Sequence, residues 1–193
     1  MEPQEEIYRH LRDLRNELGA VSGRYGEISD GEIVMMMSPV PMHAYIARSI
    51  ARQLDAQLPP TLGAFENADT DDAALGKLRI PDVLVVSEDA MKSVTPLDPR
   101  EIRLAVEIVS RSNPNTDYID KAADYPAMGI PHYLIVDPRD GTARHHWQIT
   151  TASGRPAYLN QVSYTFGDKI VIDDWTIDTT GLPRYTDDDQ APA

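Results

Sequence analysis

The sequence predicts a single α/β (α+β) domain in which helices flank a mixed β-sheet. Its 193 residues suffice for one substantial core and are too few for two. Segments with apolar residues at helical spacing alternate with runs rich in Val, Ile and Leu, and Gly, Pro or Asp-Gly residues separate them. We expect the domain to span residues 1–183 and a disordered acidic tail to follow over residues 184–193.

The N-terminal segment predicts a helix followed by a hairpin. The helix is expected over residues 4–18, because apolar residues recur there every three or four positions until Gly19. Residues 24–37 are expected to form two antiparallel strands. Asp30 and Gly31 lie between these strands and readily adopt the positive φ angles of a two-residue hairpin turn.

The rest of the chain alternates further helices with strands. An aspartate-rich segment, residues 69–77, is expected to be a loop. The last helix can begin at Asn115 or Thr116 and end at Gly129. The expected elements are a helix over 42–57, strands over 62–67, 79–87, 101–110 and 132–137, a helix over 115–128, and a terminal antiparallel meander over 143–150, 157–166 and 169–172.

The composition excludes several kinds of site. The chain has no cysteine, so disulfides, zinc–thiolate sites and thiol nucleophiles are absent. His145 and His146 alternate along an expected strand, so they should point to opposite faces and cannot easily share a metal ion. No apolar run approaches the ~20 residues of a membrane helix, and the acidic N-terminus lacks the pattern of a signal peptide. We therefore expect a cytoplasmic protein without membrane contacts.

The net charge of −13, from 31 acidic and 18 basic residues, is unusual for a protein that binds a polyanion. Setting aside six aspartates in the expected loop and tail leaves −7; these are Asp69, Asp71, Asp72 and Asp187 to Asp189. A nucleic-acid enzyme of this composition has to concentrate its basic residues around its site. The candidates for such a basic strip are Lys77, Arg79, Lys92 and Arg111.

Two otherwise apolar strands each contain one acidic residue, Asp82 and Glu107. A carboxylate buried there as an unpaired ion costs several kcal/mol, so it persists when it is paired, exposed or bound to a cation. If the strands are antiparallel neighbours, both carboxylates can meet at one end of the sheet. Together with the backbone carbonyl of Ile108, they would offer oxygen ligands to Mg²⁺. The structural alternative is that each acid pairs with an arginine such as Arg79 or Arg103.

Lys121 is the third candidate. It lies in the last expected helix beside an inward-facing stripe that includes Tyr118 and Tyr125. From this position its amine can reach the end of the sheet and orient, or help to deprotonate, a metal-bound water. The structural alternative is an i, i+4 ion pair with Asp117, which would contribute only ~0.3–0.5 kcal/mol.

In combination, several segments resemble the Uma-type restriction-endonuclease family, a bacterial group within the PD-(D/E)XK nuclease superfamily. These segments are IPDVLVV, LAVEIVSRSNP and DYIDKAADYPAMGIPHYLIVDP, together with the upstream DGEIVMMMSPVPMHAYIARSIARQL. The resemblance covers roughly residues 24–137. It implies a restriction-endonuclease-like fold and a metal-dependent endonuclease that hydrolyses phosphodiester bonds of nucleic acid, with DNA as the expected partner.

The family's site residues carry over to particular positions of this sequence. Asp82, which follows a proline, matches the PD of the superfamily signature, and Glu107 matches its second acid. The signature has lysine two residues after that acid, where this sequence has Val109. Lys121 instead matches the placement in the following helix that Uma-type sequences show. The resemblance implies that the two acids and the Ile108 carbonyl hold Mg²⁺ or Mn²⁺. A homodimer is a family-level expectation.

Four further residues are candidate accessory groups. Glu32 and Glu66 could add a carboxylate to the site, although a solvent-exposed strand acid would give the same pattern. His43 opens the helix expected over 42–57 and could contact a phosphate, hold a carboxylate or simply start the helix. Tyr125 is expected to pack in the core with its hydroxyl near the metal site.

Two other functions remain open at the level of the sequence. The acidic charge also suits a nuclease-like fold that acts as a binding or regulatory module with weak or no catalysis. It further suits a hydrolase of a smaller phosphate ester, because a fold does not determine its substrate.

Overall fold

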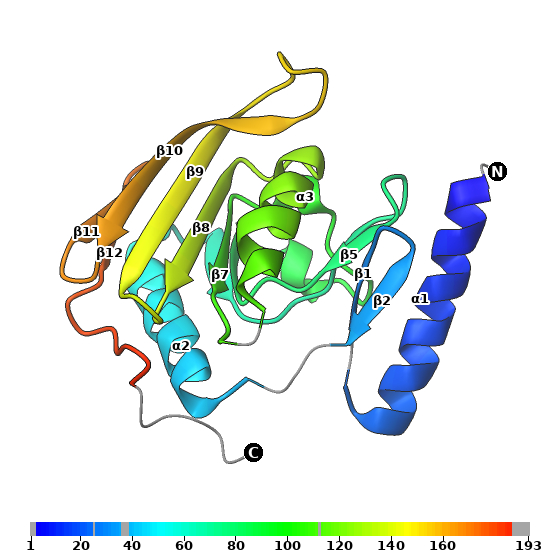
Figure 1. The fold of residues 1–193 in the computed structure, drawn as a ribbon, viewed down its shortest axis with the longest axis horizontal. Coiled ribbons are helices and arrows are strands. Elements are labelled where there is room, and N and C mark those ends of the chain that lie inside the picture. The colour runs from blue at the N-terminus through cyan, green and yellow to red at the C-terminus, as the bar shows by residue number, and fades with distance from the viewer. Residues whose placement is uncertain (1–2, 25, 36–38, 112, 187–193) are drawn as a thin grey trace.

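The computed structural model describes residues 3–24, 26–35, 39–111 and 113–186. A six-stranded mixed sheet lies at its centre, with helices on both faces (Figure 1). The strand order is β10-β9-β8-β7-β6-β3, in which β7 and β8 run parallel and the other neighbours antiparallel. The strands are β3 (Leu62–Phe65), β6 (Val83–Ser87), β7 (Leu104–Ile108), β8 (His132–Asp137), β9 (Thr142–Thr150) and β10 (Ala157–Thr165). This architecture confirms the predicted fold class.

Helices α2 (Pro41–Asp55) and α3 (Lys121–Ala127) cover opposite faces of this sheet. Helix α2 buries its stripe of Ile46, Ile50 and Leu54, as its spacing predicts. A separate hairpin of β11 (Lys169–Ile172) and β12 (Trp175–Asp178) packs into the same core as α2. The central sheet thus separates two hydrophobic cores, one on the α2 face and one on the α3 face. Each side chain of a central strand packs into one of these two cores.

The side chains of β7 alternate between these two cores. Leu104 and Val106 pack on the α2 side, whereas Ala105 and Val109 pack on the α3 side. This is the alternation that the sequence predicts for the strand. Glu107 consequently points toward α3.

A four-stranded sheet with the order β2-β1-β5-β4 lies beside the central sheet, and α1 (Pro3–Ser22) packs against it. Its strands are β1 (Gly26–Ser29), β2 (Glu32–Met35), β4 (Thr70–Asp72) and β5 (Lys77–Arg79). Asp30 and Gly31 have φ angles of 52° and 79°, which confirms the hairpin turn predicted there. Residues 36–37 of the predicted second strand lie outside the described residues.

The expectation of an acidic loop over residues 69–77 was wrong. These residues form the β4–β5 hairpin, in which Asp69 and Asp71 bind α1 and Asp72 pairs with Arg100 at 3.0 Å. Asp71 accepts hydrogen bonds from Tyr8 at 2.5 Å and from Arg12 at 2.7 Å. Asp69 pairs with Arg15 at 2.8 Å. The polar composition misled the prediction because pairing with α1, far away in the sequence, compensates these charges.

Several element boundaries also differ from the prediction. Helix α1 continues through Gly19 to Ser22, because one glycine inside a helix costs only ~1 kcal/mol. The strand expected over 79–87 is divided, since β5 and β6 belong to different sheets. The helix expected over 115–128 begins as a π-helix, Thr116–Asp120, and only then becomes α3.

The C-terminal part of the chain departs from a simple meander. The expected meander ends at β10, and β11 pairs with β12 instead. The backbone N–H of Tyr185 donates to the Pro138 carbonyl at 2.9 Å, so residues 184–186 of the predicted tail lie against the end of β8. Residues 187–193 of that tail lie outside the described part of the chain. Within the described ranges, no helix combines the length and apolar character that crossing a bilayer requires.

Candidate active site

Asp82 and Glu107 lie at the same edge of the central sheet. Strands β6 and β7 are antiparallel neighbours, with Val83 opposite Val106, so Asp82 at the start of β6 faces the end of β7. The backbone N–H of Ile108 donates to Asp82 Oδ2 at 2.7 Å. The structure thus has the strand pairing on which the predicted meeting of the two acids depended.

Glu107 is held from α3. Its side chain is 2% exposed, and its Oε2 lies 2.8 Å from Lys121 Nζ. The Tyr125 hydroxyl donates a hydrogen bond to Oε1. Both donors lie on the helix that covers this face of the sheet, one turn apart. The predicted location of Lys121 and of the Tyr125 hydroxyl beside the second acid agrees with these contacts.

Lys121 lies among three carboxylates. Besides Glu107, its amine contacts Glu27 at 3.3 Å and Asp117 at 3.6 Å. The i, i+4 pair with Asp117, which was the structural alternative for this lysine, is the longest of the three. Burial lowers the pKa of Lys121, but the surrounding carboxylates outweigh this effect and raise it above its ordinary value. The amine is therefore a buried ammonium ion.

Negative charge exceeds positive charge around this ammonium. Asp82 adds a fourth carboxylate to the three that contact Lys121. Burial raises the pKa of Glu107 well above its usual range, and the neighbouring acids add to this although Lys121 opposes it. Burial likewise raises the pKa of Asp117 to about 6, again with Lys121 opposing and Asp82 and Glu27 adding. Arg79 adds a second buried cation, because its guanidinium pairs with Glu27 at 2.8 Å, so four carboxylates lie around two cations.

His43, near the start of α2, approaches Asp82 from the other side of the sheet. Its Nε2 lies 3.2 Å from Asp82 Oδ2 and 3.0 Å from the Ile108 carbonyl oxygen. Burial lowers the pKa of His43, but the hydrogen bond and charge of Asp82 outweigh this effect and raise it. His43 thus contacts two of the three groups that the sequence predicts as metal ligands.

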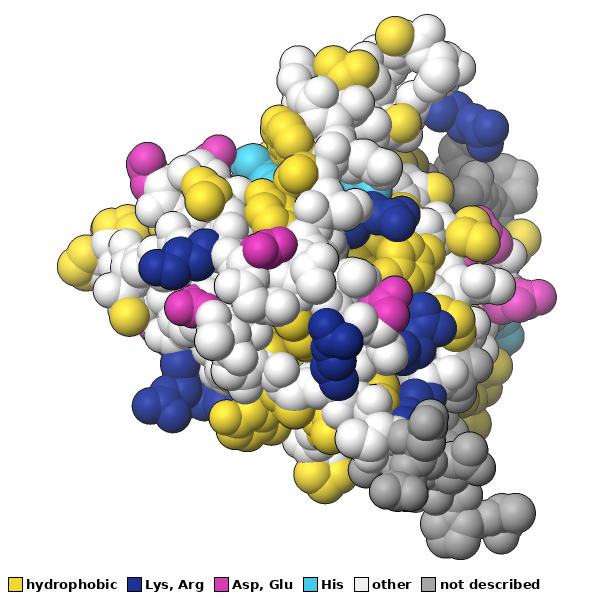
Figure 2. All heavy atoms as spheres, turned by 60° about the vertical axis from the view of Figure 1, so that its left-hand side comes forward, with side chains coloured by type: hydrophobic (Ala, Val, Ile, Leu, Met, Phe, Trp, Pro, Cys, Tyr) yellow, Lys and Arg dark blue, Asp and Glu magenta, His cyan; other side chains and the backbone are white. Residues whose placement is uncertain are grey.

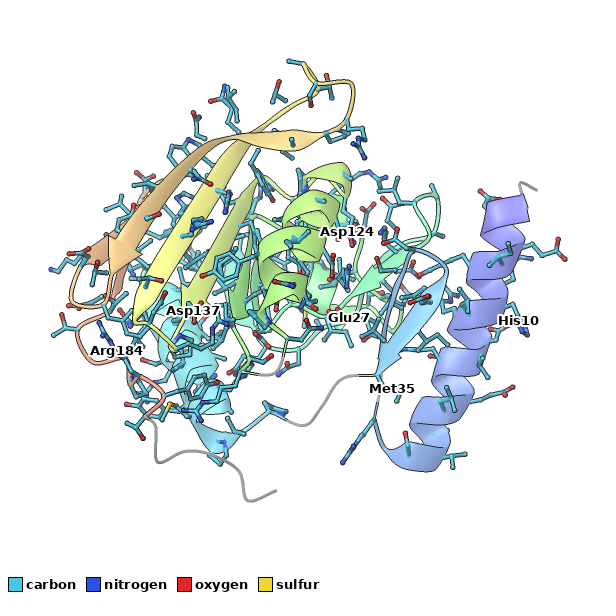
Figure 3. All side chains as sticks on the ribbon, in the orientation of Figure 1. His10, Glu27, Met35, Asp124, Asp137 and Arg184 are labelled. Carbon is cyan, nitrogen blue, oxygen red and sulfur yellow. The ribbon has the colours of Figure 1, made fainter. Side chains whose placement is uncertain are left out.

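A second buried network joins α3 to the four-stranded sheet. Arg79 pairs with Glu27 at 2.8 Å and also with Asp124, which Lys77 contacts at 2.8 Å. Figure 3 shows Glu27 and Asp124 between α3 and that sheet. Within the described residues, neither Arg79 nor Arg103 pairs with Asp82 or Glu107, so the arginine alternative is not realised there. Lys77 and Arg79 therefore do not contribute to the predicted basic strip, because both are paired with acidic residues of this network.

Glu27 joins the two networks and was missed at the level of the sequence. Its side chain is fully buried, and it also accepts a hydrogen bond from the Ile80 N–H at 2.9 Å. A glutamate in a short strand beside a turn normally indicates a solvated face. Its burial arises because α3 and β5 pack against β1, and no local signal reveals these contacts.

The other candidates lie apart from the cluster. Glu32 is exposed on β2. Glu66 follows β3 at the site edge of the sheet, but it pairs with Arg48 at 3.3 Å. Lys92, expected in the basic strip, pairs with Asp89 at 2.7 Å on the surface.

The side chains of this site have the chemistry and the charge that a divalent metal requires. Their present contacts, however, are made with other groups of the protein. Among the residues that the structure describes, no three His, Asp or Glu side chains converge as a metal site. The expected oxygen ligands are instead engaged by His43, Lys121 and Tyr125. Hard oxygen donors with surplus negative charge nevertheless suit Mg²⁺ or Mn²⁺. Binding would require these protein donors to give up part of their contacts.

Comparison with known proteins agrees with the nuclease resemblance. The family model of Uma2, described as putative restriction endonuclease, matches residues 22–173, more than half of the chain. The fold is similar to the crystal structure of a putative nuclease belonging to DUF820 from Anabaena variabilis ATCC 29413, with 14% identity and a TM-score of 0.62. That similarity covers 82% of this chain and 89% of the other, and shows a shared fold. No curated protein matches the chain. On its family match, the chain belongs to the Uma2 family of putative restriction endonucleases.

Proposed function

We propose that this protein hydrolyses phosphodiester bonds in nucleic acid, most readily DNA, with the help of Mg²⁺ or Mn²⁺. The observation that carries the proposal is the cluster of four carboxylates, Asp82, Glu107, Glu27 and Asp117, around two buried cations, Lys121 and Arg79. Buried charge is expensive unless it is compensated, so a surplus of this kind suggests a cation that arrives from solution. Perturbed carboxyl groups of this sort are enriched at functional sites.

Asp82, Glu107 and the Ile108 carbonyl are the groups we assign to the metal. A bound metal would lower the pKa of its water and neutralise charge on the scissile phosphate. Lys121 is protonated in its surroundings, so its suitable role is to orient the attacking water or to stabilise negative charge on the phosphate. The raised pKa argues against Lys121 as the proton acceptor.

His43 and Tyr125 would act as positioning residues. The Tyr125 hydroxyl fixes Glu107, and His43 hydrogen-bonds to groups on both neighbouring strands. The side chains of His43 and Asp82 are 13% and 10% exposed, whereas those of Glu107 and Lys121 are 2% exposed. A substrate would therefore approach from the N-terminal end of α2.

The test is cleavage of DNA and RNA substrates by the purified protein with Mg²⁺ or Mn²⁺. Asp82→Asn and Glu107→Gln preserve side-chain shape and should abolish cleavage. Glu32→Gln removes an equal charge from an exposed position and should leave it unchanged. If wild type cleaves and the Asp82 and Glu107 variants cleave equally well, the assignment fails. A small phosphodiester in the same assay covers the alternative of a smaller ester.

One observation favours a second candidate, a binding or regulatory module without catalysis. Protein groups already engage the expected ligands, since His43 bridges Asp82 and Ile108 while Lys121 and Tyr125 hold Glu107. A site that has lost its metal could be stabilised in this way. Calorimetric titration with Mn²⁺ distinguishes the nuclease from the binding module. Only the nuclease requires Mn²⁺ binding that is lost when Glu107 is replaced.

A further inference from the structure

Helix α1 carries an apolar stripe that the rest of the domain leaves largely uncovered. Its members recur at alternating spacings of four and three residues and are here called the α1 stripe: Ile7, Leu11, Leu14, Leu18 and Val21. Ile7, Leu14, Leu18 and Val21 are 57%, 39%, 41% and 90% exposed, and Leu11 is partly buried. Single exposed apolar residues are ordinary on protein surfaces, whereas several along one helix form a patch that favours association.

A different face of α1 packs against the four-stranded sheet. Tyr8 is buried there with Ile28 and Leu78. Arg15 is also buried, and its guanidinium donates to the Gly26 carbonyl at 2.9 Å. At 3.6 residues per turn, Tyr8 and Arg15 point about 90° away from the middle of the α1 stripe. The helix therefore has one face that the fold uses and a second, apolar face that it does not use.

The α1 stripe lies on the flank of the helix next to β2. On the other flank, Arg12 pairs with Asp71 of β4, and β2 is the opposite edge strand of this sheet. Figure 1 shows α1 beside β2 at the periphery of the molecule. Met35, at the end of β2, is 40% exposed, and Figure 3 shows it next to the C-terminal half of α1. Met35 thus extends the apolar surface.

The distant side of the molecule has no comparable stripe in view. Figure 2 shows the side of β10, β11 and β12, where hydrophobic side chains form separate groups among charged and polar ones. Helix α1 also stands apart from the domain that the family shares, because the family model begins at residue 22, where α1 ends. The α1 stripe is therefore a feature of this chain beyond the shared domain.

The chain itself offers no partner for the α1 stripe. The exposed fractions show that none of the described segments covers it. The longest segment outside the described ranges, residues 187–193, is rich in aspartate and much shorter than α1. It does not have the apolar side chains needed to cover a stripe about 21 Å long.

The α1 helix of a second copy matches the α1 stripe. Alternating spacings of four and three residues are those of a coiled-coil seam, and such a seam packs against a helix with the same spacing. In an antiparallel pair, Ile7 lies opposite Leu18 of the second copy, and Leu11 lies opposite Leu14 of the second copy. A twofold axis repeats both contacts, so that every layer contains apolar side chains from both helices.

The polar residues beside the α1 stripe favour the antiparallel orientation. His10 and Glu17 flank the stripe on its outer side, and Figure 3 shows His10 on the side of α1 away from the sheet. Antiparallel pairing brings His10 of each copy opposite Glu17 of the other, where the imidazole can donate a hydrogen bond to the carboxylate. A parallel pair would hold these residues about 10 Å apart along the axis and would align the two helix dipoles.

We propose that the protein forms a twofold dimer by antiparallel pairing of the α1 stripes of two copies. The inference does not depend on the proposed nuclease function. A contact between two helices about 30 Å long lies at the lower end of specific interfaces, which bury about 1,200–2,000 Å². We therefore expect a dissociation constant in the range of about 1–100 µM.

Sedimentation velocity of the full chain, from about 1 to 200 µM, measures this association. EDTA removes association through metal ions, and high salt screens the repulsion between two copies that each have a net charge of −13. With rising concentration, the mass of the wild type should increase from 21.5 kDa toward about 43 kDa, which is twice that value. A wild type that stays monomeric at every concentration would overturn the proposal.

Leu14→Glu is the test variant, because it places a charge in the middle of the α1 stripe of both copies. Leu14 is already 39% exposed, so the monomer should keep its fold, which circular dichroism verifies. The dissociation constant should rise by at least ~100-fold. The matched control is Ala20→Glu, which adds the same charge at an exposed position of α1 away from the stripe and should leave the dissociation constant unchanged. Equal association of the two variants would overturn the proposal.

Engineered cysteines test the orientation without altering the charge of the stripe, because the chain has no cysteine of its own. Ile7→Cys and Leu18→Cys proteins are oxidised mildly, each alone and as a mixture. In the antiparallel pair these positions of different copies lie opposite each other, so only the mixture should form a covalent dimer. A covalent dimer from either variant alone, or none from the mixture, would contradict antiparallel pairing of the α1 stripes.

Discussion

Replacing Asp117 by asparagine should stabilise the protein at neutral pH. Asp117 is buried, and its pKa is raised to about 6 from an ordinary 3.8, first by burial and then by Asp82 and Glu27. Because the folded state holds the proton more tightly than the unfolded state, ionisation of Asp117 favours unfolding. The contribution of the protonated group is complete below pH 3.8 and is lost as the pH rises through about 6.

The size of the effect follows from this shift. A rise from 3.8 to about 6 corresponds to an upper bound of about 3 kcal/mol at pH 7. Asparagine removes that cost, keeps the side-chain shape and loses the charge that contacts Lys121 at 3.6 Å. We therefore expect the free energy of unfolding to rise by about 1–3 kcal/mol at pH 7. For a domain of this size the midpoint temperature would rise by about 2–12 °C.

Urea unfolding in EDTA at several pH values between 4 and 7 measures the effect. The stabilisation should shrink as the pH falls and disappear near pH 4. Asp120→Asn on the same π-helix is the control, because Asp120 is exposed and its replacement should change stability by less than ~0.5 kcal/mol. A destabilised Asp117 variant at pH 7, or a gain that does not depend on pH, would refute the idea of an uncompensated carboxylate cluster.

Three further predictions concern stability. Tyr125→Phe removes the hydroxyl that donates a hydrogen bond to Oε1 of buried Glu107. The free energy of unfolding, measured in urea, should therefore fall by about 1–3 kcal/mol. An unchanged free energy of unfolding would contradict this prediction. Gly141→Ala should lower the free energy of unfolding by at least ~1 kcal/mol in the same assay. The added Cβ would come within 1.9 Å of Arg184 Nε, and the backbone φ of Gly141 is +72°. Wild-type stability of this variant would contradict the prediction. Burial lowers the pKa of His145 to about 4, with His132 and His146 adding, so His145 contributes stability above pH 6.5 that is lost as the pH falls toward 4. Unfolding of His145→Gln should therefore depend less on pH than that of wild type over this interval, and an equal dependence would exclude the effect.

The sequence predicted the parts of the fold and site that local pattern determines. Asp82 and Glu107 were identified because burying an unpaired carboxylate in an apolar strand is energetically costly. Their meeting then required only that two consecutive strands pair antiparallel, as consecutive strands commonly do. The alternation along β7, which directs Glu107 toward α3, follows from strand geometry alone.

The remaining features depend on contacts between segments far apart in the sequence. Glu27 is buried because α3 and β5 pack against its strand, and Asp117 joined the site although its spacing to Lys121 suggested an ordinary surface pair. Asp69 and Asp71 beside the β4–β5 hairpin are compensated by arginines of α1, and Asp72 is compensated by Arg100. Lys77, expected to face nucleic acid, instead binds Asp124 inside the protein. Ion pairs between distant segments cannot be predicted from the local sequence of either segment.

Calorimetric titration with Mn²⁺ measures whether the carboxylates around Lys121 bind a divalent cation, and it does so without requiring activity. We expect Mn²⁺ to bind to the wild type and to the exposed control Glu32→Gln, and we expect binding to be lost in Asp82→Asn and Glu107→Gln. Unchanged binding in both site variants, or no binding by the wild type, would contradict the claim that the carboxylates around Lys121 are kept for a divalent cation.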